Sequence, residues 1–247
     1  DVFTAAHLIV SLDTLKTFLS TEPSERELHL FLKNNYRVYE SRGNEDEEVL
    51  FTGYYEPVYE GALSRTKAYT YPIFSKPDDL LEIDLARFSD AYKGHKRLKA
   101  MVDFEKRRVV PYFSREQINA IDNFEDRAEP VAWLKSRVDR FFLEIQGSGR
   151  IKISETEELP VHYSTSNGNA YRSVGRYLIE KNEIPKEKMS MQAIRRWLEE
   201  NPDRMDEVLH YNDSFVFFKK EEDGPIGSIG VKVSPFRSIA TDSRLFP

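Results

Sequence analysis

The sequence contains no cysteine and only five histidines. Without cysteine the chain has no disulfide, no thiolate nucleophile and no thiolate metal ligand, and nothing follows about the redox compartment. The histidines do not occur as HxxxH or HxH pairs, so we expect no clustered metal site and no cofactor.

Long apolar runs are also missing. No segment reaches the length of a transmembrane helix, and no signal peptide is present. The chain starts at Asp1 without a methionine, which leaves an upstream export signal or lipid anchor open. The net charge of −6 gives no electrostatic reason to expect nucleic acid or anionic lipid as a partner.

What is present indicates a globular protein. Forty per cent of the 247 residues are hydrophobic and 13% are aromatic, enough for one large domain or two modest ones. Periodicity predicts helices in residues 1–42, 115–121, 190–200 and 202–210. It predicts strands in residues 49–59, 69–74, 109–113, 131–134 and 214–219.

The stretch 141–179 organises the rest of the chain. Its apolar run 141–145 predicts a strand, with Glu144 on a solvated outer face. Gln146, Gly147, Ser148 and Gly149 follow; the glycines allow either a simple hairpin turn or close approach of a ligand. A polar segment, 163–169, then leads into a helix that we expect Asn169 to cap.

Such a surface suits a carbohydrate, because it offers amides, hydroxyls and aromatic faces with little charge. Gln146 is the strongest binding candidate, with Ser148 assisting and with Asn167 and Tyr171 as further groove residues. The bland alternative is ordinary loop chemistry.

Six segments of the sequence follow one another in an order that is typical of one protein family. They are Thr52-Gly53-Tyr54-Tyr55-Glu56-Pro57, residues 142–149, residues 167–175, residues 189–195, residues 212–218 and Ser238-Ile239-Ala240-Thr241-Asp242. Together they resemble the membrane-bound lytic murein transglycosylase A family of bacterial cell-wall enzymes, from about Leu50 onward.

The resemblance implies a mainly β fold with flanking helices, divided by a groove. Its larger part is a discontinuous double-psi β-barrel, here residues 1–74 and 161–247, and a smaller β-rich domain is inserted at residues 75–160. We expect the barrel to be incomplete in this chain, with strand edges unpaired or covered by another chain.

The implied substrate is the glycan strand of peptidoglycan, in the periplasm, with an outer-membrane anchor or a separate C-terminal fragment as further expected partners. Family members cleave the MurNAc–GlcNAc β-1,4 bond without water and leave a 1,6-anhydromuramoyl end. A carboxylic acid in a partly desolvated cleft protonates the glycosidic oxygen while the C6 hydroxyl of the sugar attacks. The alternative is a non-catalytic glycan-binding or scaffolding module; a hydrolase is a third reading.

The family's acid/base aspartate lies in an Asp-x-Gly-Gly segment that this sequence does not contain. We therefore expect a piece of a longer protein, inactive or nearly so by itself. Asp242 is the best acidic residue in the chain, either as a supporting carboxylate or as a simple turn residue.

Other residues receive mixed assignments. Gly53 lies in the binding segment, and of Tyr54 and Tyr55 one belongs to the core while the other stacks on a sugar ring. We expect Glu56 to be a surface carboxylate at a bulge, and His162 to have a hydrogen-bonded structural role. Phe215, Phe217 and Phe218 are assigned to the core.

Overall fold

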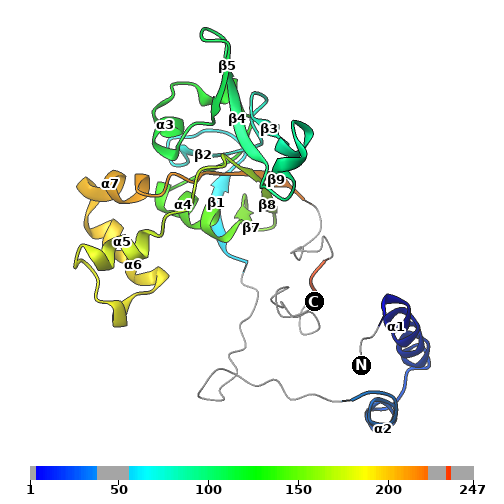
Figure 1. Ribbon diagram of the computed structural model, residues 1–247. Helices are drawn as coiled ribbons and strands as arrows, with labels where there is room; N and C mark the ends of the chain where they lie inside the picture. The colour runs from blue at the N-terminus through cyan, green and yellow to red at the C-terminus, as the bar shows by residue number, and fades with distance from the viewer. Residues whose placement is uncertain (1–3, 38–55, 222–231, 235–247) are drawn as a thin grey trace. The chain divides into compact units, whose positions relative to one another are not determined.

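Residues 4–37, 56–221 and 232–234 are described by the computed structural model (Figure 1). The chain divides into two units, residues 1–54 and 55–247, which are described separately below. Gly53, Tyr54, Tyr55 and Asp242 therefore lie outside the described residues. None of the described helices is long and apolar enough to cross a membrane.

The first unit contains two helices, α1 (Ala5–Leu19) and α2 (Glu25–Asn35). A capping box between Ser24 and Glu27 starts α2, and Pro23 lies directly before the cap. The rings of Phe18 and Phe31 stack with their centroids 3.9 Å apart. This stacked pair joins the two helices.

The second unit mixes helices and strands. Its strands are β1 (Val58–Ala62), β2 (Tyr71–Phe74), β3 (Leu81–Ile83), β4 (Leu98–Asp103), β5 (Arg108–Pro111), β6 (Pro130–Leu134), β7 (Ser148–Lys152), β8 (Glu158–Ser166) and β9 (Val216–Lys220). Its α-helices are α3 (Arg115–Ala120), α4 (Arg137–Gln146), α5 (Val174–Glu180), α6 (Met191–Glu200) and α7 (Met205–His210). Five short 3-10 helices complete it: η1 (Leu85–Arg87), η2 (Asp90–Tyr92), η3 (Phe124–Asp126), η4 (Lys186–Lys188) and η5 (Pro202–Arg204).

Six strands form the main sheet in the order β2-β6-β1-β7-β8-β9. All neighbours are antiparallel except β1 and β7, which run parallel with Val58 opposite Arg150. The edge strands β2 and β9 are not paired with each other among the described residues. The fold is thus mixed α/β with two sheets, and the double-psi barrel stays a prediction.

The domain division predicted at Ser75 and Pro160 does not coincide with a break in this sheet. Strands β6 and β7 belong to the predicted insert, yet both pair with β1, and β8 runs across Pro160. A separate three-stranded sheet, β3-β4-β5, lies wholly inside the predicted insert. The division itself stays a prediction.

The strand predicted for residues 141–145 is wrong, because these residues belong to helix α4. Ser136 caps the helix by accepting a hydrogen bond from the Val138 amide, and Gly147 ends it in the left-handed conformation. Val138, Phe141 and Phe142 are buried at the spacing of a helix face. A short, mainly apolar run such as residues 141–145 occurs both in strands and in segments of longer buried helices, so its pattern alone does not tell the two apart.

Several predictions are confirmed. The helices predicted over residues 115–121 and 190–200 are present as α3 and α6, and Trp197 and Leu198 of α6 are buried. The three phenylalanines assigned to the core are buried; they are Phe215, Phe217 and Phe218. Pro202 begins η5, which leads directly into α7.

Three buried clusters form the core of this unit. The first joins α4 to α5, α6 and α7, the helices grouped together in Figure 1. The second lies on the main sheet, with Leu134, Ile151 and Val161 fully buried. The third joins the main sheet to the β3-β4-β5 region through Phe74, Tyr112 and Phe217. Helix α4 contributes to both of the first two clusters, which fixes its C-terminal end against β7.

Candidate functional site

The end of α4 turns directly into β7 at residues 146–149. The Gly147 amide donates to the Leu143 carbonyl at 2.8 Å, and its φ of 77° is a value that glycine adopts without strain. One reading of the glycine pair predicted a hairpin turn here, but the turn joins helix α4 to strand β7 and does not close a hairpin. Ser148 is buried in this turn.

Gly149 permits a close approach of two chain segments. A Cβ atom at this position would lie 2.9 Å from the Pro57 carbonyl oxygen and 2.7 Å from a Leu143 methyl group. The same Pro57 oxygen accepts a hydrogen bond of 2.8 Å from the Arg150 amide. The residues that follow the predicted tyrosine segment thus lie beside the glycine turn.

Glu56 is mostly buried and not the surface carboxylate we expected. Its Oε2 accepts from Arg150 Nε at 2.8 Å, and its side chain is 12% exposed. The second oxygen, Oε1, is buried with no hydrogen-bond partner among the described residues. This ion pair ties the segment before β1 to β7.

Tyr163 is the aromatic residue that the sequence interpretation missed. Its amide donates to the Gly147 carbonyl at 2.6 Å, and its side chain is 50% exposed beside the turn. No alternating pattern in the sequence could have found it, because Val161 and His162 are both buried before the exposed Tyr163, and Thr165, two positions further on, is buried again. The pairing of β8 with β9 shifts register between Tyr163 and Thr165, a local irregularity that redirects side chains.

Gln146, Gly147 and Tyr163 together are called the Gln146–Tyr163 face. The Gln146 side chain is partly exposed, and its Nε2 lies 3.2 Å from the sulfur of Met191 on α6. A thioether is a weak acceptor, so the amide keeps its hydrogen-bonding capacity for a stronger partner. The face offers an amide and an aromatic ring, which suits an uncharged hydroxylated ligand.

Asn167 does not have the properties of a binding residue, which we predicted for it. It is 1% exposed, its Nδ2 donates to the carbonyls of Phe113 and Asp213 at 2.8 Å, and its Oδ1 accepts from the Phe215 and Asn169 amides. These four bonds use the full capacity of the amide, so the structure gives Asn167 a structural role.

The two other residues of this segment differ from each other. Asn169 is not the helix cap that we expected: Ser173 caps α5, and Asn169 donates to the carbonyls of Tyr112 and Phe113. Tyr171 is exposed, as a ligand-binding tyrosine would be.

The prediction that Glu144 faces solvent is wrong. Its side chain is 1% exposed and pairs with Arg115 at 2.6 Å and with Arg140 at 3.7 Å. Burial raises the pKa of Glu144 despite these two guanidinium groups, and burial also lowers the pKa of Arg140 to about 10. A raised carboxyl pKa is one signature of a general acid, but this carboxyl group is enclosed and cannot reach a polysaccharide.

Arg115 connects this buried cluster to the segment 212–215. Its Nε donates to the Asn212 carbonyl at 2.9 Å, and its terminal nitrogen donates to the Ser214 carbonyl at 2.5 Å. Its guanidinium also lies over the rings of Phe141 and Phe215. The cluster is a structural joint between α3, α4 and the entry to β9.

His162 is buried, but its Nε2 has no hydrogen-bond partner among the described residues. The expected hydrogen-bonded role is therefore not seen at this nitrogen. Within the described ranges, no group of three His, Cys, Asp or Glu side chains is placed to hold a metal ion.

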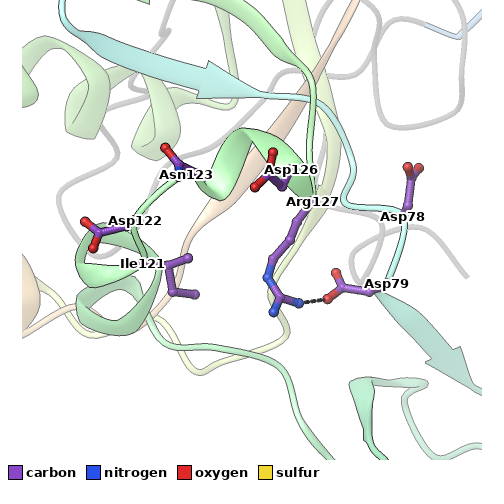
Figure 2. Close-up of a pocket in the computed structure, with 7 residues that line it drawn as sticks. All are labelled: Asp78, Asp79, Ile121, Asp122, Asn123, Asp126 and Arg127. Atoms are coloured by element: carbon purple, nitrogen blue, oxygen red, sulfur yellow. Dashed lines mark hydrogen bonds and ion pairs between the residues drawn. The ribbon is translucent and has the colours of Figure 1, made fainter.

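A pocket of about 420 Å³ lies elsewhere, between the start of the β3 region and η3 (Figure 2). It is lined by Asp78, Asp79, Ile121, Asp122, Asn123, Asp126 and Arg127. Figure 2 shows the Arg127 side chain reaching to Asp79, with which it forms an ion pair. The Tyr112 hydroxyl donates to the other oxygen of the same carboxylate at 2.7 Å, so each Asp79 oxygen already accepts a hydrogen bond. None of the predicted site residues lines this pocket.

A known protein family matches most of this chain. The family model described as "MltA specific insert domain" matches residues 50–219. The chain belongs to the MltA family. The matched range extends beyond the predicted insert of residues 75–160 at both ends.

Full-length relatives are about twice as long as the matched region. Membrane-bound lytic murein transglycosylase A of Escherichia coli K12 is 34% identical over 202 residues, covering 81% of this chain and 47% of the relative. The Vibrio cholerae protein of the same name is 29% identical over 208 residues, covering 83% and 48%. The chain thus spans about half the length of the curated relatives it matches.

Solved structures agree with this assignment. MltA from Neisseria gonorrhoeae is 29% identical with a TM-score of 0.65, over 74% of this chain and 52% of that protein. E. coli MltA with bound chitohexaose is 31% identical with a TM-score of 0.59, over 82% and 52%. The chain therefore has an MltA-like fold.

Proposed function

We propose that this chain is part of a lytic transglycosylase that binds the glycan strand of peptidoglycan through the Gln146–Tyr163 face. The observation that carries the proposal is the family match over residues 50–219, which contains this face and its supports. The relative crystallised with chitohexaose supports a sugar ligand of this chemical class. The exposed ring of Tyr163 supplies a stacking surface and Gln146 supplies donors and acceptors for hydroxyl and N-acetyl groups.

The proposed reaction is non-hydrolytic cleavage of the MurNAc–GlcNAc β-1,4 bond, giving a 1,6-anhydromuramoyl end. A carboxylic acid protonates the glycosidic oxygen, and the C6 hydroxyl then attacks the anomeric carbon while the same group takes its proton. The face itself holds no carboxyl group, and Glu144 behind it is enclosed. We therefore assign the acid/base to an aspartate outside these residues, with Asp242 as a supporting carboxylate.

Gly53, Tyr54 and Tyr55 complete the proposed binding segment. They precede Glu56 and Pro57, which the structure holds against Gly149 and Arg150. Tyr171 is a further proposed contact, because it is exposed. The proposed location is the periplasm, where peptidoglycan lies, with outer-membrane attachment of the full-length protein. The discontinuous barrel of residues 1–74 and 161–247 with its insert is part of the same proposal.

The second candidate is a non-catalytic glycan-binding or scaffolding module. The absence of a carboxyl group from the three residues of the face favours this alternative for the chain taken alone. Incubating purified murein with the chain and analysing the products by mass spectrometry separates the two functions. We expect binding and little or no release of anhydromuropeptides from this chain; abundant anhydro products would refute the assignment of the acid to residues outside it.

Glycan binding is tested directly by titrating chitohexaose into the chain and into variants. Tyr163→Ala and Gln146→Ala should each weaken binding about tenfold, because a stacked ring or a hydrogen bond is worth about 1 kcal/mol or slightly more. Tyr92→Ala, at another exposed tyrosine, is the matched control and should bind as the unaltered chain does. Equal affinity in all four proteins would exclude the Gln146–Tyr163 face.

A further inference from the structure

One face of the small β3-β4-β5 sheet is apolar and open to solvent. Residues directly opposite in an antiparallel sheet share a face, and the pairs Val102–Val109 and Leu98–Ile83 are opposite each other. Leu81 lies on this face as well, through its pairing with Ala100. The other face packs inward, since Met101 contacts the third core cluster. The apolar outer face is defined as Leu81, Ile83, Leu98, Ala100, Val102, Val109 and Pro111.

All seven residues are apolar: Leu81, Leu98, Val102, Val109 and Pro111 are exposed, Ile83 is half-buried, and the small Ala100 between them is buried. Scattered apolar residues on a surface are ordinary, but a contiguous group on one sheet face marks an interaction site. This face offers no hydrogen-bonding side chains. It is therefore better suited to contact the hydrocarbon of a membrane than a ligand that requires hydrogen bonds.

The turn between β4 and β5 extends this face with a projecting aromatic ring. Phe104 in the turn is 84% exposed, and Figure 1 shows the β4–β5 hairpin ending in a tip away from α5 and α6. Arg107 in the same turn has a φ of 49°, a left-handed value uncommon for a side-chain-bearing residue. The turn places Phe104 and the basic residues after it in one short exposed loop.

Charge around this hairpin is opposite to that of the chain. Residues 96–108 contain six basic and two acidic residues, whereas the whole chain has a net charge of −6. Arg97, Lys99 and Arg108 pair with carboxylates. Lys106 and Arg107 form no ion pair with any described residue, so both cations at the tip are available to a partner.

From these observations we propose that the β4–β5 hairpin docks on the anionic surface of a lipid bilayer. Phe104 and the apolar outer face insert among the acyl chains near the headgroups, and Lys106 and Arg107 contact lipid phosphates. The net charge of the chain argued against anionic lipid, but attraction at a surface acts within about a Debye length, about 8 Å at physiological salt, so the local charge decides. A second copy of the chain is disfavoured as the occupant, because two such tips would bring like charges together.

Flotation of the full chain with vesicles of phosphatidylcholine alone, or with about a third phosphatidylglycerol, tests the proposal. We expect binding to the anionic vesicles, with weak or no binding to the neutral ones and partial loss at high salt. Phe104→Ser should lower the partition coefficient about tenfold, and Lys106→Glu combined with Arg107→Glu should lower it at least about tenfold, since each basic residue near a charged surface is worth about 1 kcal/mol.

Two matched variants keep this test specific. Leu63→Ser alters an exposed leucine outside the hairpin, and Lys186→Glu with Lys188→Glu reverses two exposed lysines on η4. Both should bind anionic vesicles as the unaltered chain does, with circular dichroism showing that every variant is folded. Failure of the unaltered chain to bind, or equal binding by all variants, overturns the proposal. Self-association that Phe104→Ser abolishes, without vesicle binding, also overturns it and assigns the face to a second copy.

Discussion

Replacing Arg115 with methionine tests the buried joint behind the proposed glycan face. The substitution keeps most of the side-chain volume but removes the 2.6 Å ion pair with Glu144 and the donors to the Asn212 and Ser214 carbonyls. Only Arg140, 3.7 Å away, then remains near the Glu144 carboxylate. Removing one partner of a buried pair costs about 3–5 kcal/mol, and for a unit of this size each kcal/mol lowers Tm by about 2–4 °C. We expect Tm to fall by about 10 °C.

The stability lost in Arg115→Met should depend on pH, and the direction of this dependence identifies the cause of the loss. Burial already raises the pKa of Glu144 above its ordinary value of 4.5, so the stability linked to its protonated form is present below that value and is lost as pH rises through the folded-state pKa. Without Arg115 the folded-state pKa rises further, because a positive charge that lowered it is gone. Urea unfolding should therefore show a larger loss for Arg115→Met at pH 7.5 than at pH 5.

Two further proteins complete this experiment. Adding Glu144→Gln to Arg115→Met removes the unpaired charge and should recover a substantial part of the lost free energy of unfolding. Arg127→Met breaks the partly exposed pair with Asp79 and should cost about 1 kcal/mol or less. A loss below about 1 kcal/mol for Arg115→Met, or the same loss at both pH values, would refute the buried-charge reasoning.

Three other changes give distinct outcomes. Gly149→Ala should lower the free energy of unfolding by about 1–3 kcal/mol in urea titrations, because the added Cβ meets the Pro57 carbonyl. The control is Gly175→Ala, which should cost less because the nearest neighbours of its Cβ are flexible side-chain ends at 3.3 Å. Equal losses in the two variants would contradict the close approach at Gly149. Asn167→Ala should cost about 3 kcal/mol by the same measurement, because it leaves buried carbonyls and an amide unpaired, and a neutral result would show that water replaces the side chain. Burial lowers the pKa of His210, so protonation of this side chain opposes folding as the pH falls below the ordinary histidine pKa of 6.5. His210→Gln removes this effect and should flatten the dependence of Tm on pH between pH 6.5 and 5. An unchanged slope would contradict the prediction.

Local chemistry predicted some elements from the sequence alone. The capping box that starts α3, made by Ser114 and Gln117, satisfies amides within three residues, so it can be recognised from a short window. The burial of Phe215, Phe217 and Phe218 also followed from composition. Residues 141–145 were misassigned because a five-residue window omitted Ser136 and Gly147, the two residues that mark the ends of α4.

The site was harder to predict, because its supports come from distant parts of the chain. Arg115 and Glu144 are separated by 29 positions, and neither reveals its partner from its neighbours. Gln146 and Gly147 were predicted as binding residues from residue type, and that role stays a prediction, whereas the contact of Tyr163 with Gly147 depends on the pairing of β7 with β8. The burial of Asn167 arises from carbonyls near residues 113 and 213, which no local pattern shows.

The position of β1 has a consequence for synthesis of the chain. This strand leaves the ribosome before every other strand of the described residues, yet it lies in the interior of the main sheet between β6 and β7. Both of its neighbours are translated only after residue 130, so the nascent strand waits through about 70 residues with two open edges. The β7–β8 hairpin, whose partners are close in sequence, is complete almost as soon as it emerges. Factors that shield emerging strands should therefore matter most while residues 63–130 are being added.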